Sequence, residues 1–448
     1  MAVTLQLFSK RHISNIMKIR IILLLISFGL VFVAAAQQER VMDIDELFSL
    51  VEQSSALRAG RANVEAASHG VDEALAERYP GINLSLSVSY NGNVLMTDRD
   101  FGNGQWFSQP HLGNSFTVQV EQVVYSGGAI TSGINIAKLG RKSAETKVQL
   151  TRSQQRYLAL GQYLDLFCLE NRAKVYRENI ALTDSLIGEM KARYQQGMAL
   201  LNDVTRYELQ MSDLRLALRR TEDRIAIINH SLCNTLGLEN VRIVPDTTLL
   251  LDMRDSRPLE QWRNLAVESP GVRLSQIGVE IAKEQIRMSK SDLLPKVALF
   301  AADNFSGPYQ YDIPPIDNNF NVWYFGIGVK YSLSSLYKSN RKVSRAKATA
   351  HESAELLASS LERSDNNIHE AFTLYHQTCS ELDTRRKSVE LATLNYGVVR
   401  DRYFNSLALV TDMIDASNVK LDAELQEVDT QIRIVYALFT MKYITGEI

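Results

Sequence analysis

Only two short stretches of this 448-residue chain have the residue types and spacing of catalytic motifs. Gly128 and Gly133 have the glycine spacing of a phosphate-binding loop, but Ile134-Asn135 stands where that loop needs lysine followed by serine or threonine. Ser344-Arg345-Ala346-Lys347 matches the S-x-x-K string of serine acyl enzymes, yet it lies in a helical pattern without the companion motifs. We therefore predict no catalytic residue and no enzyme.

Metal and redox chemistry are not indicated either. The three cysteines, Cys168, Cys233 and Cys379, are scattered and form no C-x-x-C pair, which argues against a disulfide framework. The histidines after position 12 show no metal-ligand spacing: they are His69, His111, His230, His351, His369 and His376. The sequence thus predicts no cofactor and no metal site.

Two carboxylates are a further candidate. Asp412 and Asp415 are three residues apart and would share one face of a helix. Rings of such carboxylates in an oligomer would form a negative constriction that favours cations. Alternatively, Asp412 caps the helix that it begins, as Asp203 would at the matching place in the first half of the chain. Spacing alone leaves both interpretations open.

The elements that carry these residues occur twice. The segment that begins at Arg193 as Arg-Tyr-Gln-Gln-Gly-Met-Ala-Leu-Leu-Asn-Asp-Val returns 209 residues later, from Arg402, as Arg-Tyr-Phe-Asn-Ser-Leu-Ala-Leu-Val-Thr-Asp-Met. The same offset carries Phe116, Val118 and Val120 onto apolar residues of a second strand, namely Phe325, Ile327 and Val329. We therefore predict an internal twofold repeat.

Each copy should contain a long helical hairpin. No proline occurs between Pro110 and Pro245 or after Pro315, so both tracts can be helical over most of their length. Apolar residues alternate at spacings of three and four, as in Val204, Tyr207, Met211 and Leu214, which keeps a seam facing a partner helix. The predicted antiparallel hairpins span 128–237 and 335–445.

Two strands precede each hairpin. They are predicted at about 82–90 and 114–125 in the first copy and at about 296–302 and 321–333 in the second, where Phe300 breaks the alternation of the third strand. One face of each strand is apolar and the other polar, as for a wall between lipid and water. The predicted lipid-facing residues are Leu84, Leu86, Val88, Phe116, Val118, Trp323, Phe325, Ile327 and Val329.

Membrane strands must close into a barrel, because an open edge leaves unpaired backbone groups in hydrocarbon. Four strands are too few, since the smallest such barrels have eight. Several copies must pool their strands, and three chains would give a hollow ring of twelve. Polar residues such as Asn83, Ser85, Ser87 and Glu121 would then line the lumen.

Composition and targeting agree with export. Lys18 and Arg20 precede an apolar run that ends at Ala34-Ala35-Ala36, which predicts a signal peptide over 1–36 with Met1 or Met17 as the start. The first cysteine is Cys168, so no lipid is expected on an N-terminal cysteine. The net charge of -2 offers no field for nucleic acid.

The remaining boundaries follow from prolines and from the repeat. A helix precedes each strand pair, at about 43–78 and 259–292, and ends before Pro80 or Pro295. Repeat 1 is predicted over 37–237, a linker over 238–258 and repeat 2 over 259–448. The predicted fold is therefore mostly α-helical, with four strands per chain for an oligomeric transmembrane barrel.

These features resemble TolC-like outer-membrane efflux proteins over essentially all of 37–448. The resemblance rests on the signal peptide, the repeated order of elements, the prolines before the first and third strands, and Gly127-Gly128 after the second strand. It implies a homotrimer in the outer membrane of a Gram-negative cell. A 12-stranded barrel would continue as an α-helical coiled-coil tunnel through the periplasm.

The hairpin tip from Tyr403 to Ala416 is the best motif of this resemblance. Asp412 and Asp415 fall where the family narrows its periplasmic mouth with aspartates, so the resemblance assigns the gate to Asp412, Asp415 and Tyr403. Two departures stand out. Ser406 replaces the tip glycine, and Ala408 replaces an arginine of some members, which puts a latch through that arginine in doubt.

Apolar residues in the two tip turns have two interpretations. They either pack against neighbouring tips of the same trimer or dock onto a periplasmic adaptor (membrane fusion protein) joined to an inner-membrane pump, as the resemblance implies. An exposed apolar patch at the end of a hairpin otherwise has little reason to exist. The predicted docking residues are Gly197, Met198, Leu200, Leu201, Ser406, Leu407, Leu409 and Val410.

The predicted function is a passive exit duct of a tripartite efflux pump. The outer-membrane duct of a type I protein secretion system is an alternative, because the pump chooses most of the cargo. A structural periplasmic coiled-coil spacer is an alternative from another class, although a spacer has no use for an apolar strand series such as Trp323, Phe325 and Ile327.

Overall fold

The computed structural model describes residues 38–246, 254–309 and 316–448, and the predicted signal peptide lies outside them. The described chain is mostly helical and divides into two compact units. The tip unit comprises residues 38–54, 158–246, 254 and 378–436. The sheet unit comprises residues 55–157, 255–309, 316–377 and 437–448. The long helices contribute to both units, because three unit boundaries fall within them, after Tyr157, Gln377 and Tyr436.

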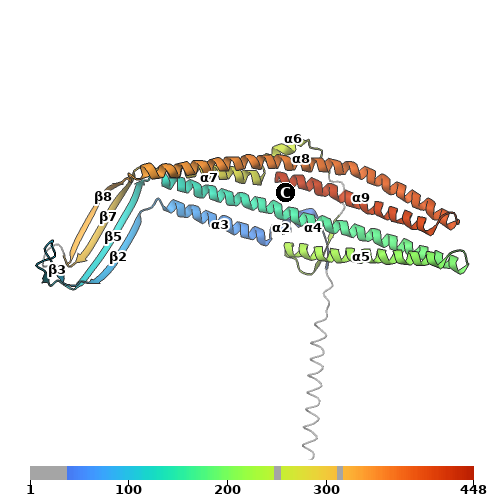
Figure 1. Ribbon diagram of the computed structural model, residues 1–448, viewed down its shortest axis with the longest axis horizontal. Coiled ribbons are helices and arrows are strands. Elements are labelled where there is room, and N and C mark those ends of the chain that lie inside the picture. Colours follow the sequence, from blue (N-terminus) through green and yellow to red (C-terminus); the bar gives the residue numbers. More distant parts are fainter. Residues whose placement is uncertain (1–37, 247–253, 310–315) are drawn as a thin grey trace, which may run out of the picture. The chain divides into compact units, whose positions relative to one another are not determined.

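The tip unit contains two helical hairpins. One is the end of α4 (Ala129–Gln195) with α5 (Leu201–Leu236), and the other is the end of α8 (Ser335–Phe404) with the start of α9 (Val410–Thr445) (Figure 1). Apolar residues of the alternating series, including Tyr207 with 0 % of its surface exposed, are buried between the helices. The apolar residues spaced by three and four thus form the core of the tip unit.

A small parallel sheet completes the tip unit, and the sequence did not predict it. Strand β1 (Gln38–Met42) precedes α2 (Ile44–Val51) and pairs with β6 (Val241–Pro245), which lies inside the predicted linker. The buried Tyr163 hydroxyl of α4 donates to the Met42 carbonyl at 2.7 Å. The first described residues of the chain and the segment after α5 therefore meet beside α4.

The sheet unit contains four antiparallel strands in the order β2-β5-β7-β8. They are β2 (Gly81–Tyr90), β5 (Leu112–Tyr125), β7 (Lys296–Gly307) and β8 (Phe320–Lys330), and they lie side by side in Figure 1. Within one chain the sheet is open, with β2 and β8 at its edges. A separate hairpin, β3 (Val94–Met96) and β4 (Gln105–Phe107), lies in the loop between β2 and β5.

Helices of the sheet unit flank these strands in the chain. They are α3 (Ser55–Ala76), α6 (Leu259–Val267), α7 (Pro270–Ser291), the first part of α4, the first part of α8 and the end of α9. Tyr157 of α4 stacks on Tyr443 of α9 with ring centroids 4.6 Å apart. In the residues that the structure describes, none of the helices combines the length and the apolar character that crossing a membrane would require.

Each helix expected before a strand pair is in fact two helices. The single helix predicted over 43–78 is interrupted between Val51 and Ser55, and the one predicted over 259–292 is interrupted at Ser269. The second interruption has a clear cause, because Pro270 disfavours helical geometry in the residue before it and is suited to the first helical position. Ser269 accordingly has an extended backbone, with ψ 150°.

Candidate functional site

The tip of the first hairpin closes with a specific hydrogen-bond pattern at the end of α4. The Met198 N–H donates to the Arg193 carbonyl at 2.9 Å, and the Gly197 N–H donates to the Tyr194 carbonyl at 2.9 Å. This is a Schellman motif, which requires a left-handed residue after the helix. Gly197 provides it with φ +69°.

The second tip has the same turn without a glycine. The Leu407 N–H donates to the Arg402 carbonyl at 2.8 Å, and the Ser406 N–H donates to the Tyr403 carbonyl at 2.9 Å. Ser406 takes the place of Gly197 and has φ +61°. The hydrogen bonds of the turn thus hold a side-chain-bearing residue in a conformation that favours glycine.

Aspartates cap the helices that return from both tips. The Leu409 N–H donates to Asp412 Oδ2 at 3.0 Å, and the Leu200 N–H donates to Asp203 Oδ2 at 3.4 Å. Both interactions satisfy a backbone donor at a helix start. The Asp412 and Asp415 side chains are exposed on α9. Capping therefore occupies one oxygen of Asp412 and leaves both carboxylates accessible to solvent.

The two tips share one apolar core. Tyr403 and Val410, predicted as gate and docking residues, are both buried in it, with 8 % and 7 % of their surface exposed. Arg193 Nη1 donates to the Phe404 carbonyl at 2.8 Å and stands over the Phe404 ring, which ties the first hairpin to the second. The core residues are Leu186, Ile187, Met190, Val204, Tyr207, Met211, Tyr403, Val410 and Met413.

Tyrosines in this core are held in the neutral form. Burial raises the pKa of Tyr207, and the neighbouring Tyr396 and Tyr403 act in the same direction. Burial also raises the pKa of Tyr403, with a further contribution from Asp203. These hydroxyls therefore stay protonated through the physiological range, and the contact between the tips does not depend on their titration.

Apolar side chains project from both turns. Leu200 and Leu409, which are 209 positions apart, each expose 69 % of their surface. Met198, Leu201 and Leu407 are exposed as well. Of the predicted docking side chains, Val410 alone is buried. The tips therefore present a matched pair of apolar surfaces on top of a common core.

The predicted lipid-facing residues come together on one face of the open sheet. Strand register pairs Leu84 with Val118 and Leu86 with Phe116, and residues opposite each other point to the same side. Ala301 of β7 is paired with Val120 of β5 on one side and with Phe325 of β8 on the other. The apolar face therefore continues from β5 through β7 to β8.

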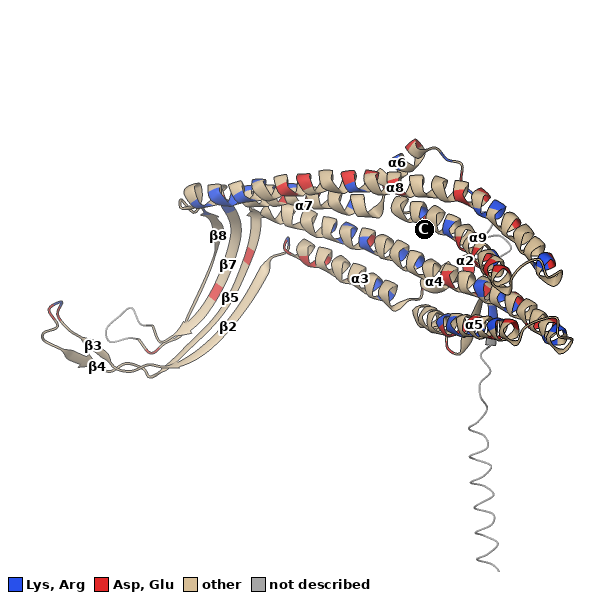
Figure 2. Ribbon diagram, turned by 45° about the vertical axis from the view of Figure 1, so that its right-hand side comes forward, with Lys and Arg blue, Asp and Glu red and all other residues tan. Residues whose placement is uncertain are grey.

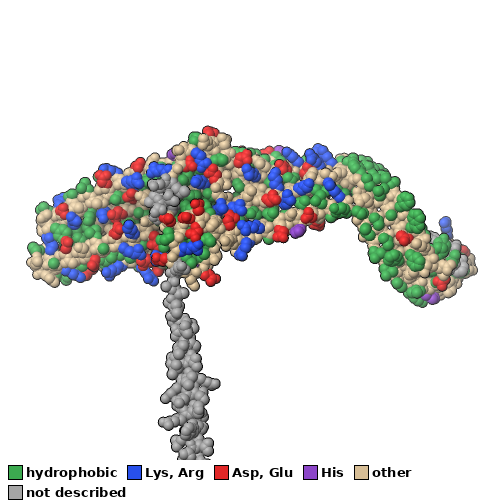
Figure 3. Space-filling view, turned by 180° about the vertical axis from the view of Figure 1, so that it is seen from behind, with side chains coloured by type: hydrophobic (Ala, Val, Ile, Leu, Met, Phe, Trp, Pro, Cys, Tyr) green, Lys and Arg blue, Asp and Glu red, His purple; other side chains and the backbone are tan. Residues whose placement is uncertain are grey.

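The apolar residues of this face are largely exposed in the single chain. Leu84, Trp323 and Phe325 expose 68 %, 69 % and 78 % of their surface. Figure 3 shows hydrophobic side chains gathered over the strands, and Figure 2 shows the charged residues concentrated on the helices. Asp303 is an exception, because its register with Val118 and Trp323 places it on the apolar face.

A polar cluster inside the tip unit was missed by the sequence reasoning. Arg172 of α4 forms an ion pair with Asp429 of α9, and its Nε donates to Asp429 Oδ1 at 2.9 Å. Cys168 Sγ donates to the same oxygen at 3.2 Å, and burial together with that hydrogen bond raises the pKa of this thiol to about 12. The thiol is therefore unreactive. No local signal could reveal a contact between residues 257 positions apart.

Metal ligation has no support in the described parts of the chain. No group of three or more histidine, cysteine, aspartate or glutamate side chains there is arranged to hold a metal ion.

Comparisons with known proteins agree with this arrangement. Residues 48–238 match the family model described as outer membrane efflux protein. The outer membrane efflux protein BepC of Brucella suis is 18% identical over 406 residues, covering 89% of this chain and 84% of BepC.

Solved structures show the same fold. The outer membrane protein VceC of Vibrio cholerae has a TM-score of 0.74 at 15% identity. The match covers 90% of this chain and 96% of the VceC chain. The CmeC outer membrane channel of Campylobacter jejuni has a TM-score of 0.73 at 13% identity, covering 90% and 85%.

Proposed function

Starting from the confirmed resemblance to TolC-like outer-membrane efflux proteins, we propose that this chain forms a homotrimeric outer-membrane channel. The channel is the exit duct of a tripartite efflux pump and conducts substrates passively from the periplasm to the exterior. The open sheet with one apolar face is the single observation that carries the proposal.

Closure of the barrel requires other copies. Strands β2 and β8 are edges within one chain, and an unpaired edge is not tolerated in lipid. Pairing β2 of one copy with β8 of the next removes both edges, and three copies close a ring of twelve strands. The apolar face then meets lipid, and Asn83, Ser85, Ser87 and Glu121 face the lumen.

The tips serve as the periplasmic end of the duct. The exposed leucines of each turn dock onto a periplasmic adaptor, which links the channel to an inner-membrane pump. The twofold repeat gives each chain two such tips, so the trimer presents six similar surfaces. Asp412 and Asp415 form carboxylate rings at the mouth and favour cations there.

The proposed organisation of the chain follows from this function. A signal peptide over 1–36 directs export, repeat 1 covers 37–237, and repeat 2 covers 259–448. The segment 238–258 between them is a connection that includes β6. Anchoring to the outer membrane relies on strands and not on a lipid at an N-terminal cysteine.

Two substitutions on neighbouring residues of β8 test the proposal. Phe325→Asp places a charge on the apolar face, whereas Tyr324→Asp places the same charge on the opposite face. We expect the purified wild type and Tyr324→Asp to run as trimers in detergent and to conduct in planar bilayers. Phe325→Asp should fail to assemble in membranes, since a charged side chain on the lipid face is destabilising. A wild-type protein that stays monomeric and gives no conductance would overturn the proposal.

A further inference from the structure

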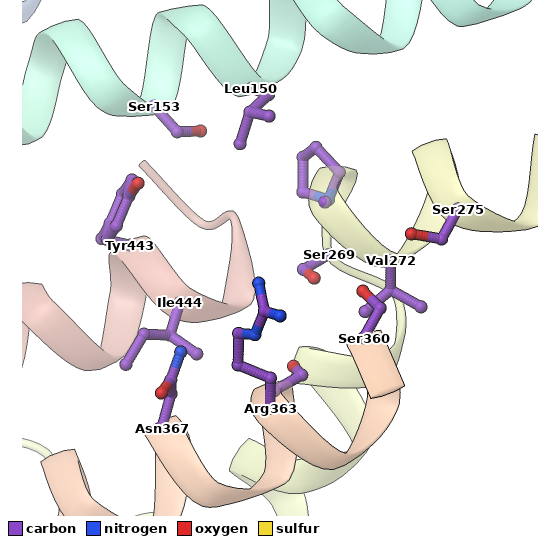
Figure 4. A pocket seen from close by; sticks show the side chains of 13 residues that line it. Leu150, Ser153, Ser269, Val272, Ser275, Ser360, Arg363, Asn367, Tyr443 and Ile444 are labelled. Atoms are coloured by element: carbon purple, nitrogen blue, oxygen red, sulfur yellow. The ribbon is translucent and has the colours of Figure 1, made fainter. Parts of the chain in front are cut away.

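A cavity of about 370 Å³ lies among the helices of the sheet unit. Figure 4 shows side chains from α4, α7, α8 and the end of α9 converging on it. Its lining includes one arginine and several hydroxyls but neither aspartate nor glutamate. The balance of charge in the cavity is therefore positive.

Arg363 supplies that positive charge. Figure 4 shows its side chain rising from α8 toward Ser269 at the start of α7. Arg363 is exposed, and none of the carboxylates in the described ranges pairs with it. A guanidinium that enters a cavity without a counter-ion favours an anion in that place.

Buried hydroxyls point to the same space. Ser153 of α4 and Ser269 before α7 expose only 4 % and 7 % of their surface. Neither side chain has a hydrogen-bond partner in the part of the chain that the structure describes, and the Ser269 side chain makes no capping bond. In Figure 4 the Ser153 hydroxyl is directed into the cavity. Neither oxygen is among the fully enclosed unpartnered atoms of the described residues, so both can reach a ligand in the cavity and donate to it.

The start of α7 adds two backbone donors. Helix α7 has 22 residues and begins at Pro270, so the N–H groups of Gly271 and Val272 have no acceptor within the helix. Both residues line the cavity. A helix N-terminus carries partial positive charge and favours anions.

The walls of the cavity are held in place by packing that does not use these donors. Tyr443, which lines the cavity, stacks on Tyr157. Gly446 lies so close to Pro270 that an added Cβ would stand 2.6 Å from the proline Cδ. The next residue, Glu447, forms two hydrogen bonds with Arg257, of 2.7 and 2.9 Å. The start of α7 is thus fixed in position before any ligand arrives.

From this convergence we propose that the cavity binds a small oxyanion, a phosphate or carboxylate group, between Arg363, the start of α7 and the hydroxyls of Ser153 and Ser269. The volume admits a small anion together with waters. The bound anion joins α4, α7 and α8, and so it stabilises the sheet unit.

Calorimetric titration of the full-length protein in detergent tests this site. Sodium phosphate and sodium acetate are titrated separately, with ionic strength held constant by sodium chloride, so that phosphate and carboxylate ligands are distinguished. We expect saturable binding of at least one anion, near one per chain. Arg363→Gln should weaken that binding by about 10-fold or more, since a charge-assisted hydrogen bond is lost.

Matched variants separate specific binding from general charge. Arg345 is exposed on the same helix, as Arg363 is, but it does not line the cavity, so Arg345→Gln should bind as the wild type does. Arg363→Lys should be intermediate because it keeps the charge and loses the planar fork. Ser153→Ala should weaken binding about 3-fold, and it carries the test alone if Arg363→Gln does not fold. Absence of saturable binding to the wild type, or equal affinity in all variants, overturns the proposal.

Discussion

Substitution of the two tip leucines can test docking without destabilising the fold, because both leucines occupy N-cap positions of helices. Leu200 is the residue before α5 and Leu409 the residue before α9, so both are N-cap positions. Asparagine is a better N-cap than leucine by up to about 1 kcal/mol. Leu200→Asn with Leu409→Asn therefore removes the apolar surface without weakening the hairpins and without changing the net charge.

The expected loss of docking follows from exposure. Full burial of a leucine contributes roughly 1.5–3 kcal/mol, and each tip leucine exposes 69 % of its surface. Covering them would contribute about 1–2 kcal/mol each and about 2–4 kcal/mol per chain. Docking should then weaken by about 30- to 1,000-fold per chain.

The assay is export from cells that carry the cognate adaptor and pump, with trimer yield and thermal stability measured on the purified protein. Leu200→Met with Leu409→Met is the control, since it preserves apolar volume and should export normally. We expect the asparagine pair to form stable trimers that do not export. Normal export by the asparagine pair at equal expression, or equal failure of the methionine pair, would refute the reasoning.

Three smaller predictions concern stability. Ser406→Gly should raise the free energy of unfolding of the purified trimer by about 0.5–1 kcal/mol per chain, because it removes the strain of a serine in the left-handed conformation. An unchanged or lower melting temperature would contradict this. Gly326→Val should impair trimer yield, because a Cβ at Gly326 would lie 2.9 Å from the Phe300 ring, and the second substitution Phe300→Ala should restore part of the yield. Burial acts to raise the pKa of Asp255, but hydrogen bonds from Arg257 outweigh it and hold that pKa below its ordinary 3.8. This stabilisation is present above pH 3.8 and is lost as the pH falls through the lowered pKa. The difference in melting temperature between wild type and Arg257→Gln should therefore be largest at neutral pH and shrink in acid, and a constant difference would argue against it.

The sequence could predict the features that depend on local periodicity. Heptad spacing places Val204, Tyr207 and Met211 in a seam, and the structure buries all three. The 209-residue offset relates Gly197 to Ser406, and the two turns have the same hydrogen bonds. These features depend on neighbours within a few residues, so a pattern in the sequence contains most of the information.

Features that depend on contacts between residues far apart in the chain could not be predicted from the sequence. The strands β1 and β6 have five residues each and lie about 200 positions apart, so neither has enough alternation to be recognised. The same limit hides the Arg172 to Asp429 ion pair. The spacing of Asp412 and Asp415 likewise could not decide between a cap and a gate, and the hydrogen bond to Leu409 establishes the cap while the exposure of both carboxylates leaves the gate as a proposal.

Strand β7 illustrates how a local exception is resolved by a neighbour. Phe300 breaks the alternation because an aromatic ring stands on the polar face, and the strand was predicted over about 296–302. The structure extends β7 to Gly307, since Phe300 lies over Gly326 and Gly328 of β8, which have no side chains to oppose the ring. An aromatic ring that covers facing glycines fills the gap that they would leave and fixes the register of the pair. The residue that seemed to interrupt the strand is thus one that holds β7 and β8 together, and the glycines of β8 are the signal that would have shown it.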